Sequence, residues 1–147
     1  MYAPNFFSST YKSIIEQSYQ NYELIIIYDD EDLSELKMIK KIINKNPKVK
    51  ILCNIRNLGA GLSRNYGIKK SRGKFISFID ADDIWFKNKI KEKIKFIQKK
   101  GHDFICCNYR KKFDTKIINV KSKYKIDYQD LLSSCSIGLS TVMLRRK

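Results

Sequence analysis

Short apolar runs alternate along the chain with longer stretches in which apolar residues recur every three or four positions. The first run, Tyr22 to Tyr28, is nearly continuous and rich in isoleucine, which is typical of a buried parallel strand. From Leu33 to Ile43 the apolar residues take helical spacing, and Asn46-Pro47 stops the predicted helix. A second strand is predicted from Val49 to Cys53.

The middle of the chain repeats this alternation. A glycine-bearing turn, Asn57 to Gly61, precedes a predicted helix from Ser63 to Ser71, and a third strand is predicted from Lys74 to Ile79. The next predicted helix is strongly basic and ends at Gly101. Its apolar stripe consists of Phe86, Ile90, Ile94 and Ile97. A fourth strand is predicted from Asp103 to Tyr109.

Beyond Tyr109 the pattern weakens. It indicates a strand at Ile117 to Val120, a short helix near Tyr128 to Leu132 and an apolar segment at Ser140 to Leu144. The alternation of strands and helices predicts an α/β, Rossmann-like fold with a mainly parallel, doubly wound sheet and helices on both faces. We interpret residues 1–147 as one domain, because 147 residues with 43% hydrophobic composition suit a single core and no linker or repeat interrupts them.

Acidic residues follow the third predicted strand, at the sheet edge where doubly wound folds bind ligands. Asp80, Asp82 and Asp83 lie within four positions. On extended backbone the carboxylates of Asp80 and Asp82 would project to one side and could share a divalent cation. Oxygen ligands suit Mg²⁺ or Mn²⁺, which proteins often hold with one or two carboxylates plus substrate phosphates. The alternative is that Asp82 and Asp83 cap the following helix.

A second acidic group, Asp29 to Asp32, follows the first predicted strand. Carboxylates there could accept hydrogen bonds from a ribose hydroxyl or a base N–H. The alternative, an acidic first turn that favours the dipole of the next helix, fits Glu31 and Asp32 better than Asp29 and Asp30. Arg64, in the helix after the glycine-bearing turn, offers a planar array of donors to a base or a phosphate. The alternative interpretation is that Arg64 is an ordinary surface arginine.

The charge and the cysteine content limit the functional classes to which this chain can belong. Thirty Lys+Arg against fifteen Asp+Glu give a formal net charge of +15, which could attract phosphates, nucleic acid or an anionic membrane. The lysines are spread along the chain, and a biased codon usage gives the same tally, so we expect no specific nucleic-acid partner. The four cysteines form no CxxC pair, which disfavours zinc. Neither a signal peptide nor a membrane span is recognised, which predicts a soluble, cytoplasmic chain.

Four segments of the chain, taken in their order and spacing, are more specific as a family pattern than any one of them alone. They are Gln17 to Asp30, Asn57 to Gly59, Ser63 to Ile68 and Arg72 to Asp83. Through them, over about residues 8–110, the chain resembles family 2 glycosyltransferases. The resemblance implies a GT-A fold and the inverting transfer of a sugar from a nucleoside-diphosphate donor to an acceptor hydroxyl.

The resemblance also implies roles for individual residues. Asp29 or Asp30 would contact the base, and Arg64 would lie beside the nucleotide. Asp82 would be the main ligand of a divalent ion, Mn²⁺ or Mg²⁺, with Asp80 as a second ligand nearer the ribose. The metal would stabilise the leaving diphosphate. The acceptor would be a saccharide or a lipid-linked molecule of surface polysaccharide or lipopolysaccharide biosynthesis, which allows peripheral contact with the inner face of a membrane.

The chain departs from the family pattern in two places, which we interpret as truncation at both ends. The first strand of the fold is largely missing, and Met1 to Phe6 retain only a remnant of its turn. The general base that an inverting transferase needs is not recognised, because Asp127 and Asp130 do not form the family's acidic motif. No catalytic residue is therefore named. A non-catalytic donor-binding remnant stays open as an alternative, and a basic nucleic-acid-binding module is a third.

Overall fold

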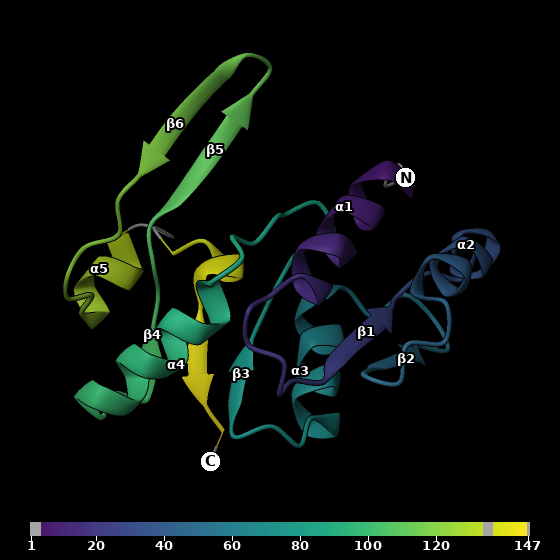
Figure 1. Cartoon of the computed structure of the whole chain (residues 1–147), viewed down its shortest axis with the longest axis horizontal. Coiled ribbons are helices and arrows are strands. Elements are labelled where there is room, and N and C mark those ends of the chain that lie inside the picture. The colour runs from purple at the N-terminus through teal and green to yellow at the C-terminus, as the bar shows by residue number, and fades with distance from the viewer. Residues whose placement is uncertain (1–3, 134–136, 147) are drawn as a thin grey trace.

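The computed structural model of the chain describes residues 4–133 and 137–146, so Cys135 lies outside the described residues. The helices are α1 (Pro4–Ile15), α2 (Ser34–Ile43), α3 (Ala60–Lys70), α4 (Lys89–Lys100), α5 (Tyr128–Ser133) and the 3-10 helix η1 (Leu139–Thr141). The strands are β1 (Leu24–Tyr28), β2 (Val49–Cys53), β3 (Phe75–Ser77), β4 (Phe104–Ile105), β5 (Tyr109–Phe113), β6 (Lys116–Val120) and β7 (Met143–Arg145). This confirms the predicted α/β class (Figure 1).

The first sheet is the parallel pair β1–β2, in register from Leu24 opposite Val49 to Tyr28 opposite Cys53. Helix α3 packs on β1 at Gly67, where an added Cβ would lie 3.5 Å from Cγ1 of Ile27. A Cβ at Gly67 would make only ordinary van der Waals contact with Ile27, so the packing of α3 on β1 does not require glycine there. The carboxyl ends of β1 and β2 open towards the start of α3 as the α/β pattern predicts.

The second sheet differs from the expected parallel arrangement. β7 lies between β3 and β4 and pairs antiparallel with both. Residues 140–144, which the sequence marked only as apolar, thus supply η1 and the central strand of this sheet. β3 and β4 run in the same direction, but among the described residues they do not pair with each other. The fold is therefore a mixed α/β arrangement, with its parallel ladder confined to β1–β2 in the described part of the chain.

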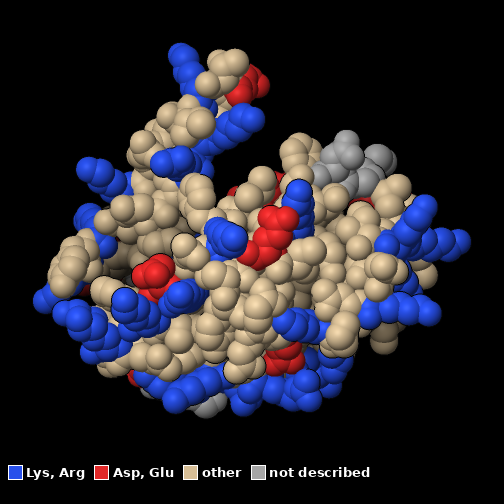
Figure 2. All heavy atoms as spheres, in the orientation of Figure 1, with Lys and Arg blue, Asp and Glu red and all other residues tan. Residues whose placement is uncertain are grey.

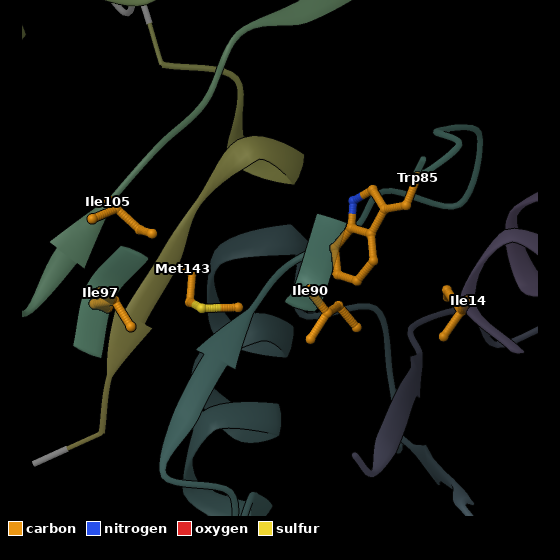
Figure 3. Close-up of a cluster of buried hydrophobic side chains, with 6 residues drawn as sticks. All are labelled: Ile14, Trp85, Ile90, Ile97, Ile105 and Met143. Atoms are coloured by element: carbon orange, nitrogen blue, oxygen red, sulfur yellow. The ribbon is translucent and has the colours of Figure 1, made fainter. Parts of the chain in front are cut away.

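The largest core cluster lies between α4, the second sheet and the end of α1 (Figure 3). It consists of Ile14, Trp85, Ile90, Ile97, Ile105 and Met143. Ile97 is completely buried, and Ile90 lies on the same side of α4, as their helical spacing predicts. α4 ends at Gly101, which has the left-handed φ of 67° that favours glycine after a helix.

Three sequence expectations are wrong in detail. The turn remnant expected at Met1 to Phe6 is instead helical from Pro4 onwards, as the start of α1. Phe86, placed in the stripe of the basic helix, precedes α4 and is exposed, because the helix begins only at Lys89. The single strand expected from Asp103 to Tyr109 is divided into β4 and the start of β5.

Strands β5 and β6 form a hairpin that projects from the rest of the molecule (Figure 1). Its turn contains Asp114, which has a left-handed φ of 47°. Within residues 4–133 and 137–146, no helix combines the length and the apolar composition that crossing a bilayer requires.

Candidate functional site

The end of β1 is fastened to the end of β2 and the start of α3 by Asp29. Its Oδ1 accepts hydrogen bonds from Nδ2 of Asn54 at 2.6 Å and from the backbone N–H of Leu58 at 2.9 Å. Partial burial raises the pKa of Asp29, but bonds from Asn54, Leu58, Ser63 and Gly59 outweigh it, so the pKa lies below its ordinary value. Asp29 is therefore an ionised brace at the mouth of the parallel sheet.

Asp30 and Asp32 have different surroundings, and both are exposed. Oδ1 of Asp30 accepts a bond from the backbone N–H of Asp32 at 3.0 Å. Asp32 in turn accepts bonds from the backbone N–H and the hydroxyl of Ser34, at the start of α2, which lower the pKa of Asp32. The helix-start interpretation therefore fits Asp32, while Asp30 keeps an exposed carboxylate beside the end of β1.

Arg64 and Asp80 contact each other directly. Nη2 of Arg64, on α3, lies 2.8 Å from Oδ1 of Asp80, which follows β3. Both side chains are about two-fifths exposed, at 39% and 44%. The structure thus brings together two residues that the sequence assigned separately to the nucleotide, and it presents them at the surface where a ligand can compete for the same atoms.

The backbone from Asp80 to Asp83 is a turn rather than the extended chain expected. The backbone N–H of Asp83 donates to the carbonyl of Asp80 at 3.1 Å. The projection of alternate carboxylates to one side, which assumed extended backbone, is therefore wrong as an argument for Asp80 and Asp82. Asp82 is exposed, and no hydrogen bond or ion pair to its carboxylate is found among the described residues. Nor do Asp82 and Asp83 cap α4, because its N-cap is Asn88.

This turn is positioned by elements distant in sequence. The backbone N–H of Asp80 donates to Oγ of Ser140 at 2.9 Å, and Oγ1 of Thr10 donates to the carbonyl of Ala81 at 2.8 Å. Ser13, one turn further along α1, accepts from the backbone N–H of Trp85 at 3.1 Å. Thr10 and Ser13 are buried small polar residues on one face of α1, and their helical spacing was the only available signal for these contacts.

Two lysines of α4, the partly buried Lys89 and the buried Lys93, reach the same region. Nζ of Lys89 donates to the carbonyl of Ser140 at 2.5 Å, and Nζ of Lys93 donates to the carbonyl of Thr141. Burial lowers the pKa of Lys89 to about 8, and it lowers the pKa of Lys93 as well. Their role was missed from the sequence, which showed them only as part of a basic helix. They hold η1, and hence Ser140, against the turn that carries Asp80.

The carboxylates present fit a metal only with help from a ligand. Among the described residues, no group of three or more His, Cys, Asp or Glu side chains is arranged to hold an ion. Within residues 4–133 and 137–146 the carboxylate of Asp82 has no partner, and Asp80 has one oxygen bound to Arg64. Two carboxylates are sufficient for Mg²⁺ or Mn²⁺ when phosphate oxygens complete the coordination, so a metal carried with a diphosphate fits this turn.

The acidic residues further along the chain are engaged in local structure. The backbone N–H of Asp130 donates to Oδ1 of Asp127 at 2.9 Å, and that of Asp127 donates to Oδ2 of Asp130 at 3.3 Å. Asp130 also pairs with Lys123, which with these bonds lowers its pKa. This reciprocal arrangement at the start of α5 is a helix cap. It supports no general-base role for either residue.

Comparisons with known proteins bear on the family and the fold of the chain. The family model described as Glycosyl transferase family 2 matches residues 4–142. WfgD of Escherichia coli, named as a UDP-Glc:alpha-D-GlcNAc-diphosphoundecaprenol beta-1,3-glucosyltransferase, is 34% identical over 140 residues, which cover 95% of this chain and 54% of WfgD. The chain therefore spans about half the length of this curated relative.

Solved structures share the fold. Residues 1–349 of S. aureus TarS superpose with a TM-score of 0.70 at 18% identity, covering 99% of this chain and 45% of that one. The mannosyltransferase PcManGT from Pyrobaculum calidifontis, in complex with GDP-Man and Mn2+, gives a TM-score of 0.65 at 14% identity, covering 71% and 32%. These likenesses confirm the expected GT-A-type fold. Together with the match of the family model over nearly the whole sequence, they establish that this chain belongs to glycosyltransferase family 2.

Proposed function

We propose that this chain forms the donor-binding part of an inverting glycosyltransferase of surface polysaccharide biosynthesis. The donor is a nucleoside-diphosphate sugar, bound with a divalent ion, and the acceptor hydroxyl belongs to a saccharide or a lipid-linked molecule. The observation that carries the proposal is the contact of Arg64 with Asp80 after the carboxyl end of β3, in the turn that also carries the exposed Asp82. WfgD, whose name specifies a UDP-glucose donor and a diphosphoundecaprenol-linked acceptor, supports the same class of substrates.

Each of these residues binds a different part of the donor. Asp30, exposed beside the braced Asp29, accepts hydrogen bonds from the base or ribose. Asp82 and Asp80 hold the ion, as the presence of Mn2+ and GDP-Man in the PcManGT complex supports. When bound, the ion neutralises charge that develops on the departing diphosphate. Arg64 exchanges Asp80 for a phosphate oxygen, since a guanidinium binds either anion with two parallel donors.

Arg64 and Asp80 are suited to this exchange because their ion pair is partly exposed. A pair of this kind stabilises a protein by about 0–1 kcal/mol, so its opening costs little compared with the binding of a diphosphate. In the absence of donor, the pair keeps both side chains oriented at the end of β3. We infer that the free protein holds the site in a nearly assembled state.

The test is calorimetric titration with UDP-glucose and GDP-mannose, with and without Mn²⁺, on the unchanged chain, Asp82→Asn and Asp83→Asn. Asp83 lies in the same turn and is also exposed, so it is the matched control. We expect metal-dependent binding that Asp82→Asn weakens at least tenfold and Asp83→Asn weakens less than threefold, since loss of one charged ligand costs about 1.5–3 kcal/mol. Equal effects of the two substitutions, or no binding of any donor, would contradict the site.

A donor-binding chain without turnover remains the second candidate, because no general base is found among the described residues. Release of nucleoside diphosphate from a bound donor distinguishes the two. Binding accompanied by release supports an active transferase, whereas binding alone supports the non-catalytic form. This measurement uses the same samples as the titration.

A further inference from the structure

The β5–β6 hairpin is a projecting element with both faces open to water. No third strand pairs with it among the described residues. Its base is fixed, because Ser122 donates from its backbone N–H to Oδ1 of Asn108 at 2.9 Å and from Oγ to the carbonyl of Cys107 at 3.1 Å. Arg110 also lies over the ring of Phe86, 5.5 Å from its centroid. The outer half is therefore held away from the body while it buries few side chains of its own.

The outer half of the hairpin combines cationic and apolar side chains in every cross-strand pair. Lys111 lies opposite Ile118, Lys112 opposite Ile117 and Phe113 opposite Lys116. Residues directly opposite in an antiparallel pair project to the same face, and successive pairs alternate between faces. Each face therefore carries both a positive charge and a large apolar group. Phe113, Ile117 and Ile118 are 51–60% exposed, although large apolar side chains are normally buried.

The segment that follows continues this composition. Tyr124, Tyr128 and Leu132 are strongly exposed, at 91%, 71% and 63%. Residues 109–125 contain one acidic residue, Asp114, against the basic residues Arg110, Lys111, Lys112, Lys116, Lys121, Lys123 and Lys125. Figure 2 shows basic side chains along the projecting hairpin with uncharged ones between them. This density of both kinds of side chain is what distinguishes the segment from an ordinary solvated lysine-rich surface.

An anionic membrane surface satisfies both kinds of group at once. Lysine and arginine contact anionic headgroups, and each is worth about 1 kcal/mol near such a surface. Apolar side chains at the same level enter the boundary between headgroups and acyl chains, while lysine stems extend to keep their charges in water. A nucleic acid would meet the charges but would leave isoleucine side chains in water, so it fits the hairpin less well.

We propose that the β5–β6 hairpin docks this protein on an anionic membrane turn first, so that Phe113 and Ile118 on one face and Ile117 on the other enter between headgroups that Lys111, Lys112 and Lys116 contact. Membrane binding itself does not depend on the proposed function. Its consequence does depend on it. Gly138 lies beside Tyr109 at the base of the hairpin, since a Cβ added there would be 3.5 Å from the Tyr109 ring, and it lies two residues before Ser140, which holds the Asp80 turn. A docked hairpin would therefore keep the donor site close to a lipid-linked acceptor.

Co-sedimentation with vesicles tests the proposal without donor or acceptor. The vesicles are phosphatidylcholine alone and phosphatidylcholine mixed with phosphatidylglycerol. A charge variant, Lys111→Gln with Lys112→Gln and Lys116→Gln, is compared with Lys37→Gln, Lys40→Gln and Lys41→Gln on α2, which removes equal charge from exposed positions elsewhere. An apolar variant, Phe113→Ser with Ile118→Ser, is compared with Met38→Ser and Ile55→Ser, which are also exposed.

We expect binding to the mixed vesicles only. The charge variant should bind roughly a hundredfold more weakly, since each lysine contributes about fivefold, and the apolar variant at least about tenfold more weakly. Both control variants should stay within about threefold of the unchanged chain. Equal losses in the hairpin and α2 charge variants would reduce the effect to net charge and overturn the proposal. Binding that requires the lysines but not Phe113 and Ile118 would indicate a general polyanion surface, and would also overturn it.

A fluorescence measurement tests whether the tip of the hairpin enters the membrane. Trp85 is the sole tryptophan and is buried, so Phe113→Trp adds one exposed reporter against a constant background. Its emission should shift to the blue, and its quenching by iodide should fall, on addition of mixed vesicles. An unchanged spectrum for a bound protein would refute insertion. Absence of donor binding with intact vesicle binding would contradict the proposed function alone.

Discussion

Substitution of Gln17 tests whether the loop that carries the Asp80 turn is held by a single buried amide. Gln17 is 1% exposed and lies just after α1. Its Nε2 donates to the carbonyls of Ser13 at 3.0 Å and Phe86 at 2.9 Å, and its Oε1 accepts from the backbone N–H of Ile90 at 3.1 Å. The side chain thus joins the end of α1 to the last part of the loop, at Phe86, and to the start of α4, at Ile90.

The size of the effect follows from which groups lose their partners in Gln17→Met. Methionine has similar length and no polar side-chain group for these bonds, so the change removes them with little change in packing volume. The carbonyl of Phe86 keeps a bond from the backbone N–H of Lys89. The carbonyl of Ser13 and the N–H of Ile90 lie in terminal helical turns, where no helical partner is available. Two buried groups left unpaired at roughly 1–3 kcal/mol each predict a loss of about 2–6 kcal/mol.

Urea denaturation monitored through Trp85 measures this loss. With a slope of about 2 kcal/mol per molar urea, the midpoint should fall by about 1–3 M. Gln98→Met is the control, because Gln98 is exposed on α4 and its substitution should change stability by less than about 0.5 kcal/mol. A similarly small change for Gln17→Met would refute the view that these hydrogen bonds hold the loop.

Two further predictions concern charged residues of the site. Arg64→Met should weaken donor binding at least tenfold while the free energy of unfolding changes by about 1 kcal/mol or less, and Arg72→Met, which disrupts an ion pair elsewhere, should leave donor binding unchanged. Because burial lowers the pKa of Lys89 from 10.5 to about 8, the unfolded chain binds more protons between these pH values, and the free energy of unfolding should rise with pH there. Lys89→Met should flatten this rise in urea titrations at pH 8 and pH 10, and an unchanged slope would exclude Lys89 as its source.

Elements with a continuous apolar pattern or a specific terminating residue were predictable from the sequence. The residues of β2 agree with the prediction because a short apolar run leaves little freedom in its bounds. α4 ends at the predicted Gly101, whose left-handed conformation is set locally. The placement of acidic residues at the ends of β1 and β3 also followed from strand position alone.

What could not be predicted depends on contacts between distant segments. α1 turns its small polar residues Thr10 and Ser13 inwards, so an apolar stripe does not reveal it. The Asp80–Asp83 turn is set by Ser140 and α1 rather than by its own residues, which is why the extended-chain argument failed there. The division of Asp103 to Tyr109 into two strands likewise reflects pairing with β7, which the local pattern does not encode.

The central position of β7 determines when the site can assemble. β3 and β4 are separated by this later strand, so their sheet stays incomplete until residues 143–145 are available to pair. During synthesis on the ribosome, the β1–β2 ladder and α3 can form well before then, because their contacts are closer in sequence. The second sheet requires a slow search for distant partners, and its exposed edges are vulnerable to aggregation in the interval. We therefore expect the proposed nucleotide-sugar binding to be acquired late in folding and lost early under mild denaturation.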